Sequence, residues 1–268
     1  HIMLVIYVKE VMFMYNDKIT ARLHQLCNEN KDFDEAVKQM ESQHQFVISQ
    51  ITHEIRNPLT LINSTVQLIE SHYPEIAESS LWEQLTDDIS DLILLLEDVT
   101  TYNHSKELNL ESSNIYEMLQ KLIQSFLIYT ANNDIKIQLN TNENSLPKLE
   151  SFICDSIKLR QAFTNIIKNA VEAIGDTGDI YINIQEEKKN LATSDNNTDY
   201  ISISFKNNGE PIDPLEQSNI FKPFITHKPN GTGMGLAITD QIINAHDGFI
   251  ECLFDDTWTE FKIFLPLR

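Results

Sequence analysis

The sequence predicts a multidomain protein in which a long helical part precedes a compact α/β domain. All seven glycines lie beyond residue 174, and no proline precedes Pro58. Because glycine and proline most often interrupt helices, their scarcity before residue 174 indicates long helices there. After residue 110, segments with helical spacing alternate with short segments of strand character, which is typical of a sheet covered on one face by helices. The 268 residues are enough for more than one domain.

Composition narrows the class of protein and its partners. The chain is 41% hydrophobic and 22% charged, which is typical of a folded soluble protein. Its 40 acidic and 20 basic residues give a net charge of −20, which opposes binding to nucleic acid or to anionic membrane surfaces. Residues 4–15 are apolar but too short to span a bilayer, so membrane association would need a further segment. The three cysteines are scattered, as reduced thiols in a cytosolic protein usually are.

Residues 1–44 are predicted to form an N-terminal segment and a coiled-coil stalk. The seam positions follow steps of four and three: Ile19, Leu23, Leu26, Asn30, Phe33, Val37, Met40, His44, Val47 and Ile51. Such a repeat predicts a parallel coiled coil, in which a buried Asn30 would fix a two-stranded register. The alternative is an amphipathic helix that packs on its own domain.

Residues 45–110 are predicted to form a helical hairpin. Pro58 should loosen the first helix, and a break near residues 71–80 contains Pro74. Apolar residues at helical spacing lie on both sides of this break, at Ile62, Val66 and Ile69 and at Trp82, Leu85, Ile89, Leu92, Leu96 and Val99. Two such hairpins from two chains would bury their seams as a four-helix bundle.

Residues 111–268 are predicted to form the α/β domain. Helices are expected at residues 113–130, 156–174 and 234–245, and strands at residues 135–141, 179–185, 200–206, 248–254 and 259–267. A polar loop at residues 186–199 joins two of the strands.

The first motif that carries chemistry is His53-Glu54-Ile55-Arg56-Asn57-Pro58-Leu59. If Ile51 and Ile55 point inward, His53 projects outward with Glu54 beside it and Asn57 one turn further along. An exposed imidazole can act as a nucleophile whose proton is taken by a neighbouring carboxylate. The alternative is a solvated surface histidine without a chemical role.

Three further motifs lie in the predicted α/β domain. Asn165 and Asn169 share one helical face, where they are either simple surface polarity or ligands of a hydrated Mg²⁺ ion and phosphate oxygens. Asn207-Asn208-Gly209-Glu210-Pro211-Ile212 follows a strand. Residues 220–236, IFKPFITHKPNGTGMGL, end in alternating glycines before a helix, and such glycines let backbone N–H groups surround a phosphate.

The ordered set HEIRNPLT, NIIKNAVEA, NNGEPI, IFKPFITHK and GTGMGLAIT resembles the sensor histidine kinases of two-component signalling over residues 40–268. The resemblance implies a dimerisation and histidine-phosphotransfer hairpin, followed by an ATP-binding α/β sandwich of the Bergerat type. It implies that His53 is the phosphoacceptor, that Glu54 is its general base and that Asn57 serves dephosphorylation of the partner.

The resemblance also implies an ATP site. Its residues would be Asn165, Asn169, Asn207, Gly209, Phe221, Phe224, Thr226, Lys228, Gly231, Thr232, Gly233, Met234, Gly235 and Leu236. Among them, Asn169 would contact Mg²⁺ through the bound ATP, and Phe221 and Phe224 would be the hinges of a lid.

One departure from the family concerns the residue that binds the adenine base of ATP. The family usually has Asp-x-Gly-x-Gly where this chain has Asn207-Asn208-Gly209-Glu210-Pro211. An asparagine can still accept a hydrogen bond from the adenine amino group, but the loss of charge assistance amounts to about 1 kcal/mol. We therefore expect ATP binding that is weakened but survives.

The expected activity is ATP- and Mg²⁺-dependent phosphorylation of His53 in a homodimer, with transfer to an aspartate on a response-regulator receiver domain. Phosphatase activity toward that regulator is an additional expectation, and the expected location is the cytoplasm, including the cytoplasmic portion of a larger sensor. The alternatives are a catalytically weakened scaffold dimer and an ATPase of the gyrase, Hsp90 and MutL type. Such an ATPase needs a carboxylate on the asparagine helix, where Gln161 stands one turn before Asn165.

Overall fold

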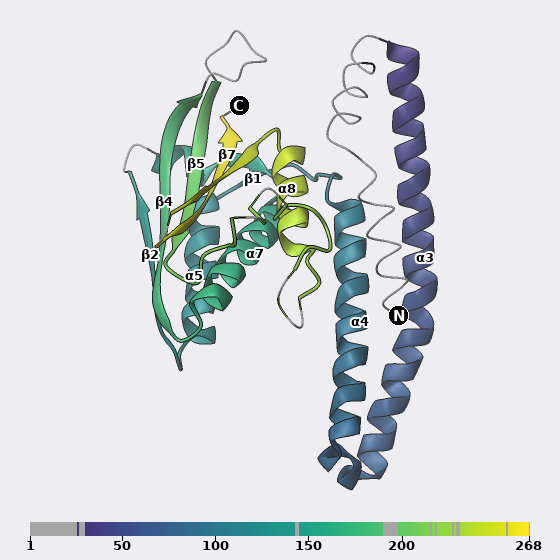
Figure 1. The fold of residues 1–268 in the computed structure, drawn as a ribbon. Helices are drawn as coiled ribbons and strands as arrows, with labels where there is room; N and C mark the ends of the chain where they lie inside the picture. Colours follow the sequence, from purple (N-terminus) through teal and green to yellow (C-terminus); the bar gives the residue numbers. More distant parts are fainter. Residues whose placement is uncertain are drawn as a thin grey trace. The chain divides into compact units, whose positions relative to one another are not determined.

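A computed structural model describes residues 26, 30–142, 145–189, 198–214, 216–217, 219–226, 228, 231–255 and 257–267. The chain divides into two compact units between Asn103 and His104 (Figure 1). The N-terminal apolar segment at residues 4–15, the first seam positions and Cys27 lie outside the described residues.

The first unit is a helical hairpin. Helix α3 (Lys31–His72) and helix α4 (Ser80–His104) run antiparallel and are joined through the short 3₁₀ helix η1 (Pro74–Glu78) (Figure 1). This confirms the predicted break near residues 71–80. The hairpin core consists of Leu59, Val66 and Ile89, with Trp82, Ile93 and Leu96 packed against it.

The heptad pattern predicted that Asn30 would occupy a buried seam position, but the structure places it elsewhere. Its backbone is extended, and its side-chain oxygen accepts hydrogen bonds from the backbone N–H groups of Asp32 (3.0 Å) and Phe33 (3.3 Å). Asparagine competes well for this position because its short side chain reaches the unpaired donors of the first helical turn. Asn30 is therefore the N-cap of α3, and the uninterrupted helix predicted through it is wrong.

The apolar seam of the hairpin divides into two sets. Val66 and Ile89 are buried within the hairpin, whereas Ile62, Leu85 and Leu92 are 51%, 43% and 39% exposed. On α3 the side chains near the histidine that are buried within one chain are Thr52 and Leu59. Ile51 and Ile55, predicted to point into a two-chain bundle, are 52% and 48% exposed in the single chain. The reason is that one helix can turn only part of its apolar surface toward its partner in the hairpin.

No described helix combines the length and the apolar character that a membrane span requires.

The second unit contains a five-stranded mixed sheet in the order β2-β4-β5-β7-β6. Its strands are β2 (Asp134–Thr141), β4 (Thr177–Lys189), β5 (Thr198–Asn207), β6 (Phe249–Phe254) and β7 (Thr259–Pro266). Helices α5 (Ile115–Tyr129), α7 (Ser156–Ile174) and α8 (Gly235–Ala245) cover one face (Figure 1). A helical region followed by an α/β domain is the fold class that the sequence predicts.

Three short elements of the second unit were not predicted. Strands β1 (Glu111–Ser113) and β3 (Phe152–Cys154) pair antiparallel, and helix α6 (Leu146–Glu150) precedes β3. Elements of three to five residues are too short to show a helical or strand period in a sequence.

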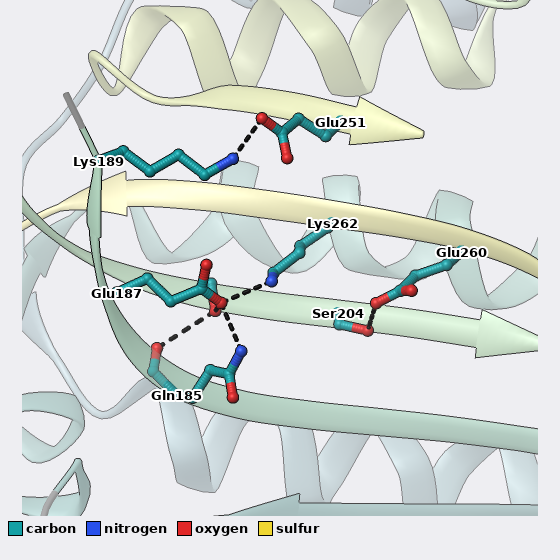
Figure 2. A network of polar contacts seen from close by, with 8 residues as sticks. Gln185, Glu187, Lys189, Ser204, Glu251, Glu260 and Lys262 are labelled. Carbon is teal, nitrogen blue, oxygen red and sulfur yellow. Dashed lines mark hydrogen bonds and ion pairs between the residues drawn. The ribbon is translucent and has the colours of Figure 1, made fainter. Parts of the chain in front are cut away.

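The two faces of the sheet differ in polarity. Side chains on the helix-covered face, such as Ile182, Ile203 and Ile263, are almost fully buried. The opposite face carries a polar network in which Glu187 accepts hydrogen bonds from Ser202 and pairs with Lys262 (Figure 2). Burial acts to raise the pKa of Glu187, but the bonds from Lys262 and Ser202 outweigh it and lower the pKa. This face is an ion-paired surface, and the predicted nucleotide residues lie away from it.

Candidate functional site

The candidate phosphoacceptor, His53, lies on α3 in the helical unit. His53, Glu54 and Asn57 are all exposed on this helix. Two contacts hold this stretch of α3 against α4: the Arg56 guanidinium donates to Thr100 Oγ1 (3.0 Å), and Asn103 donates to the carbonyl of Gln45 (2.7 Å). The imidazole is therefore accessible to solvent on a stretch of helix that is anchored on both sides.

Pro58 lies inside α3, which continues without a break to His72. Because proline has no N–H, it cannot donate to the carbonyl of Glu54, four residues earlier, as a helical residue would. The predicted loosening thus takes the form of a missing hydrogen bond one turn after His53, within a continuous helix.

Helix α7 carries the two asparagines that the sequence singled out. The Asp155 side chain caps its first turn by accepting from the backbone N–H of Lys158 (3.0 Å), and Phe163, Ile166 and Ile167 face the core. Asn165 is half-buried and donates to the carbonyl of Gly235 (2.9 Å) and to Thr239 Oγ1 (3.4 Å). Asn165 thereby fixes the start of α8 against α7.

Asn169 holds a cation at the end of the lid. Its side-chain oxygen accepts from Lys228 Nζ (2.9 Å), which also pairs with the carboxylate of Glu172 one turn further along α7. Lys168 reaches the same carboxylate at 3.8 Å. A positive group is thus placed at the asparagine face of α7, where it could also pair with a phosphate.

The lid residues contact the sheet and the glycine segment. Phe221 packs edge-on against Phe261 of β7, with 6.4 Å between ring centroids. Phe224 has a φ of +65°, which is strained for a residue with a side chain, and its N–H donates to the carbonyl of Gly233 (3.0 Å). The Lys228 N–H donates to Thr226 Oγ1 (3.2 Å).

Gly233 is required by its surroundings. Its φ is +68°, and a Cβ atom at this position would lie 2.7 Å from the backbone of Phe224 and Ile225. Only glycine permits this close approach without displacement of the hinge. Beside Gly233 lie the half-buried Gly231 and Thr232 and the buried Met234.

The first turn of α8 can bind an anion. The N-cap residue, Met234, offers no side-chain acceptor, and the turn that begins with Gly235 and Leu236 contains no acidic residue. The unpaired backbone N–H groups at a helix N-terminus and the helix dipole both favour a negative charge. The glycine segment and this turn together are chemically suited to a phosphate chain.

The turn after β5 is held against the end of α7. The Glu210 N–H donates to the carbonyl of Ala173 (2.8 Å), and a Cβ atom on Gly209 would lie 2.5 Å from the Ala173 backbone. Asn207, the last residue of β5, is only 3% exposed, and within the described residues its side-chain nitrogen has no hydrogen-bond partner. An unpaired buried donor points to a ligand that supplies the acceptor.

Asp155, the N-cap of α7, and His246, the C-cap of α8, join these two helices. The Asp155 N–H donates to His246 Nε2 (3.0 Å), and the buried His246 Nδ1 lies 2.7 Å from the carbonyl of Ile242. Burial acts to raise the pKa of Asp155, but hydrogen bonds from the backbone of Asn109 and Lys158 and the Lys158 charge outweigh it and lower the pKa.

The structure brings all the predicted nucleotide residues into the α/β unit, on the asparagine face of α7, the lid, the first turn of α8 and the end of β5. His53, Glu54 and Asn57 lie in the helical unit. Sequence reasoning missed Glu172, Thr239 and Thr259. Glu172 could have been found, because it continues the helical face of Asn165 and Asn169. Thr259 could be identified only from the structure, in which it pairs with Asn207 across neighbouring strands.

Comparison with known proteins relates this chain to histidine kinases. Residues 154–268 match the family described as histidine kinase-, DNA gyrase B- and HSP90-like ATPase. The chain is 28% identical over 224 residues to the sensory histidine kinase/phosphatase NtrB of Rhizobium meliloti, covering 81% of this chain and 57% of that protein. It is 32% identical to sporulation kinase A of Bacillus subtilis, covering 81% of this chain and 34% of that protein. The chain thus spans about a third to three fifths of the length of these curated relatives.

Solved structures share the fold. The full-length ShkA in complex with AMPPNP superposes with a TM-score of 0.64 at 20% identity, covering 82% of this chain and 45% of that chain. The histidine kinase AdeS of Acinetobacter baumannii gives a TM-score of 0.53 at 19% identity, covering 81% of this chain and 98% of that chain. The chain is thus similar to sensory histidine kinases over 81% of its length, and its residues 154–268 match the family of histidine kinase-, DNA gyrase B- and HSP90-like ATPases.

Proposed function

We propose that this chain is an ATP-dependent protein-histidine kinase that phosphorylates His53. The observation that carries the proposal is the exposed His53–Glu54 pair on a hairpin whose chain continues into an ATPase-family domain. The names of the relatives, a sensory histidine kinase/phosphatase and a sporulation kinase, support the same activity.

The nucleotide site proposed here uses the α/β unit alone. The phosphates would meet the unpaired N–H groups at the start of α8 and the glycine segment, with Lys228 as the nearby cation. The base would meet Asn207, whose buried nitrogen has no partner among the described residues. Asn169 would hold Mg²⁺ together with phosphate oxygens once its side-chain oxygen exchanges Lys228 for the ion, and the ion would neutralise charge on the transferred phosphoryl group.

The proposed reaction uses two neighbouring side chains of α3. Glu54 removes the imidazole proton while a nitrogen of His53 attacks the γ-phosphorus of ATP in line. The new bond joins nitrogen to phosphorus, the bond from phosphorus to the bridging oxygen breaks, and ADP leaves with the bonding electrons. Catalysis of this kind rests on positioning and charge neutralisation. The phosphoryl group then passes to an aspartate on a response-regulator receiver domain. Asn57 would take part in a separate reaction, the dephosphorylation of that regulator.

The proposed assembly is a homodimer joined through the hairpin. Ile51, Ile55 and Ile62 of α3 are about half-exposed in one chain, at 52%, 48% and 51%, and Leu85 and Leu92 of α4 are partly exposed as well. Covering these side chains with a second copy would complete a four-helix bundle. We further propose the domain limits 1–44, 45–110 and 111–268, and a location in the cytoplasm.

The test is incubation with ATP labelled at the γ-phosphate. Wild type and the matched variant His72→Ala, which also removes an exposed histidine of α3, are expected to acquire an acid-labile label. The variant His53→Ala should acquire none, and Glu54→Gln should be labelled at least tenfold more slowly. Equal labelling of His53→Ala and wild type would refute the assignment.

The same experiment separates the two alternatives. An inactive scaffold would bind its partners without label in any variant. A gyrase-type ATPase would release phosphate at the same rate in wild type and in His53→Ala. Gln161 carries no carboxylate, and Glu172 of the same helix pairs with Lys228 and Lys168, so neither is placed as a free base.

A further inference from the structure

Two unpaired polar groups lie side by side at the end of the sheet. Asn207 on β5 pairs in register with Thr259 on β7, and the two residues are 3% and 4% exposed. Neither Asn207 Nδ2 nor Thr259 Oγ1 has a hydrogen-bond partner among the described residues. A buried polar group without a partner is destabilising, so two in one cross-strand pair indicate a place where a ligand completes the bonding.

The groups around this pair are apolar. Ile180 lies beside Asn207 on β4, and Phe205 and Phe261 form the next cross-strand pair on the same face of the sheet, all three of them buried. The lid residue Phe221 packs edge-on against Phe261. A flat ring with a polar edge matches this environment, because its faces would contact the apolar side chains while its edge meets the amide and the hydroxyl.

The amide of Asn207 can pair with either purine. An amide offers one acceptor oxygen and one donor nitrogen, whereas a carboxylate offers acceptors only. Adenine presents a donor at its 6-amino group and an acceptor at N1, and guanine presents the reverse, an acceptor at O6 and a donor at N1. A half-turn of the amide about its last side-chain bond exchanges its oxygen and nitrogen, so both edges can be matched. The Thr259 hydroxyl can also either donate or accept.

We propose that Asn207 and Thr259 make the base site of this protein permissive, so that it binds guanine nucleotides about as well as adenine nucleotides. The inference rests on the proposed function, because it assigns the base specificity of the same nucleotide site. A carboxylate at position 207 that meets the 6-position of the base would favour adenine, since it accepts from the 6-amino group but faces the O6 of guanine with a like partial charge. N1 is then left to the Thr259 hydroxyl, which can donate to N1 of adenine or accept from N1–H of guanine.

The experiment measures nucleotide binding to the full chain by displacement of a fluorescent ATP analogue in the presence of Mg²⁺. ATP, GTP and ITP are the competitors, and ITP carries the O6 and N1–H edge of guanine without its 2-amino group. In wild type, the dissociation constants for GTP and ITP are expected to lie within tenfold of that for ATP. In Asn207→Asp, the ratio of GTP to ATP dissociation constants should rise at least tenfold, as expected for one lost hydrogen bond between buried groups.

Two further variants keep the result specific. Asn208→Asp introduces the same charge one residue away and keeps the acceptor for the Asp179 N–H, so its GTP to ATP ratio should equal that of wild type. Thr259→Val should weaken both nucleotides. A wild-type ratio above tenfold, or an unchanged ratio in a folded Asn207→Asp, would overturn this inference and leave the proposed kinase standing. Failure of wild type to bind any of the three nucleotides would overturn both.

Discussion

The two units bury their apolar side chains to very different extents. In the α/β unit, large side chains such as Phe163 and Phe205 are at most 1% exposed, with their rings 5.6 Å apart. In the helical unit, Ile51, Ile55 and Ile62 are each about half-exposed, at 52%, 48% and 51%. The α/β unit therefore completes its own core, whereas the hairpin exposes an apolar stripe, which the proposed dimer would cover. Four changes test this contrast.

The largest effect is expected in the core of the α/β unit. Phe163→Ala removes a fully buried ring from the contact between α7 and β5 and should lower the free energy of unfolding by about 3–5 kcal/mol. Chemical denaturation followed by circular dichroism measures this loss. The control is Phe46→Ala, which truncates a ring that is 62% exposed and should change stability by less than about 1 kcal/mol. Equal losses in the two variants would contradict the contrast.

The apolar stripe of the hairpin should act between chains. The double variant Ile62→Glu/Leu92→Glu places charge on two partly exposed seam positions and should weaken self-association at least a hundredfold, about 3 kcal/mol. Sedimentation equilibrium measures the association, and Gln67→Glu/Gln84→Glu adds the same charge at exposed polar positions of the same helices. A double seam variant that stays as dimeric as this control would show that the stripe is not the interface.

In the proposed nucleotide site, Gly233 and Gly235 should differ in how well they tolerate a side chain. Gly233→Ala should destabilise the lid by about 2 kcal/mol and weaken nucleotide binding, because φ is +68° and the new Cβ would meet the hinge backbone at 2.7 Å. At Gly235 the nearest atom to a new Cβ lies at 3.7 Å, so Gly235→Ala should change both quantities little. Calorimetric titration with a non-hydrolysable ATP analogue compares the two variants. Equal affinities would remove the proposed role of Gly233.

The smallest effect concerns acid stability of the α/β unit. The lowered pKa of Asp155 in the folded protein means that its carboxylate stabilises the fold above about pH 4, and that this contribution is lost as the pH falls through the lower folded-state pKa. Asp155→Asn keeps a capping side chain but removes the charge, so it should cost about 1 kcal/mol at neutral pH. Denaturation between pH 3 and pH 7 should show the two proteins converging at the acid end. A constant difference across that range would contradict this assignment.

Helical spacing and turn residues predicted most of the fold. The period of apolar residues located both long helices, and Pro74 marked the break between them, because these signals are local in the chain. The same period failed at Asn30, since a seam asparagine and a capping asparagine can occupy the same sequence position. It also could not assign Ile62 and Val66 to different surfaces, because that division depends on how α3 and α4 pack.

The candidate site was predictable where its residues are close in sequence. The spacing of Asn165 and Asn169 and the alternating glycines predicted the phosphate end of the proposed site. The pairing of Asn207 with Thr259 depends on strand register across 51 intervening residues, which no local pattern carries. The departure at Asn207 was visible in the sequence, but its unpaired nitrogen and its unpaired neighbour emerged only from the structure.

The central claim is that phosphate passes from ATP to His53, and the most direct measurement is to locate it. After incubation with Mg·ATP, the chain is digested at alkaline pH and its peptides are analysed by mass spectrometry. The account predicts one added phosphoryl group on the imidazole of His53, absent from the matched peptide of His53→Ala. Phosphate on any other residue, or ADP formation without a phosphorylated peptide, would contradict it.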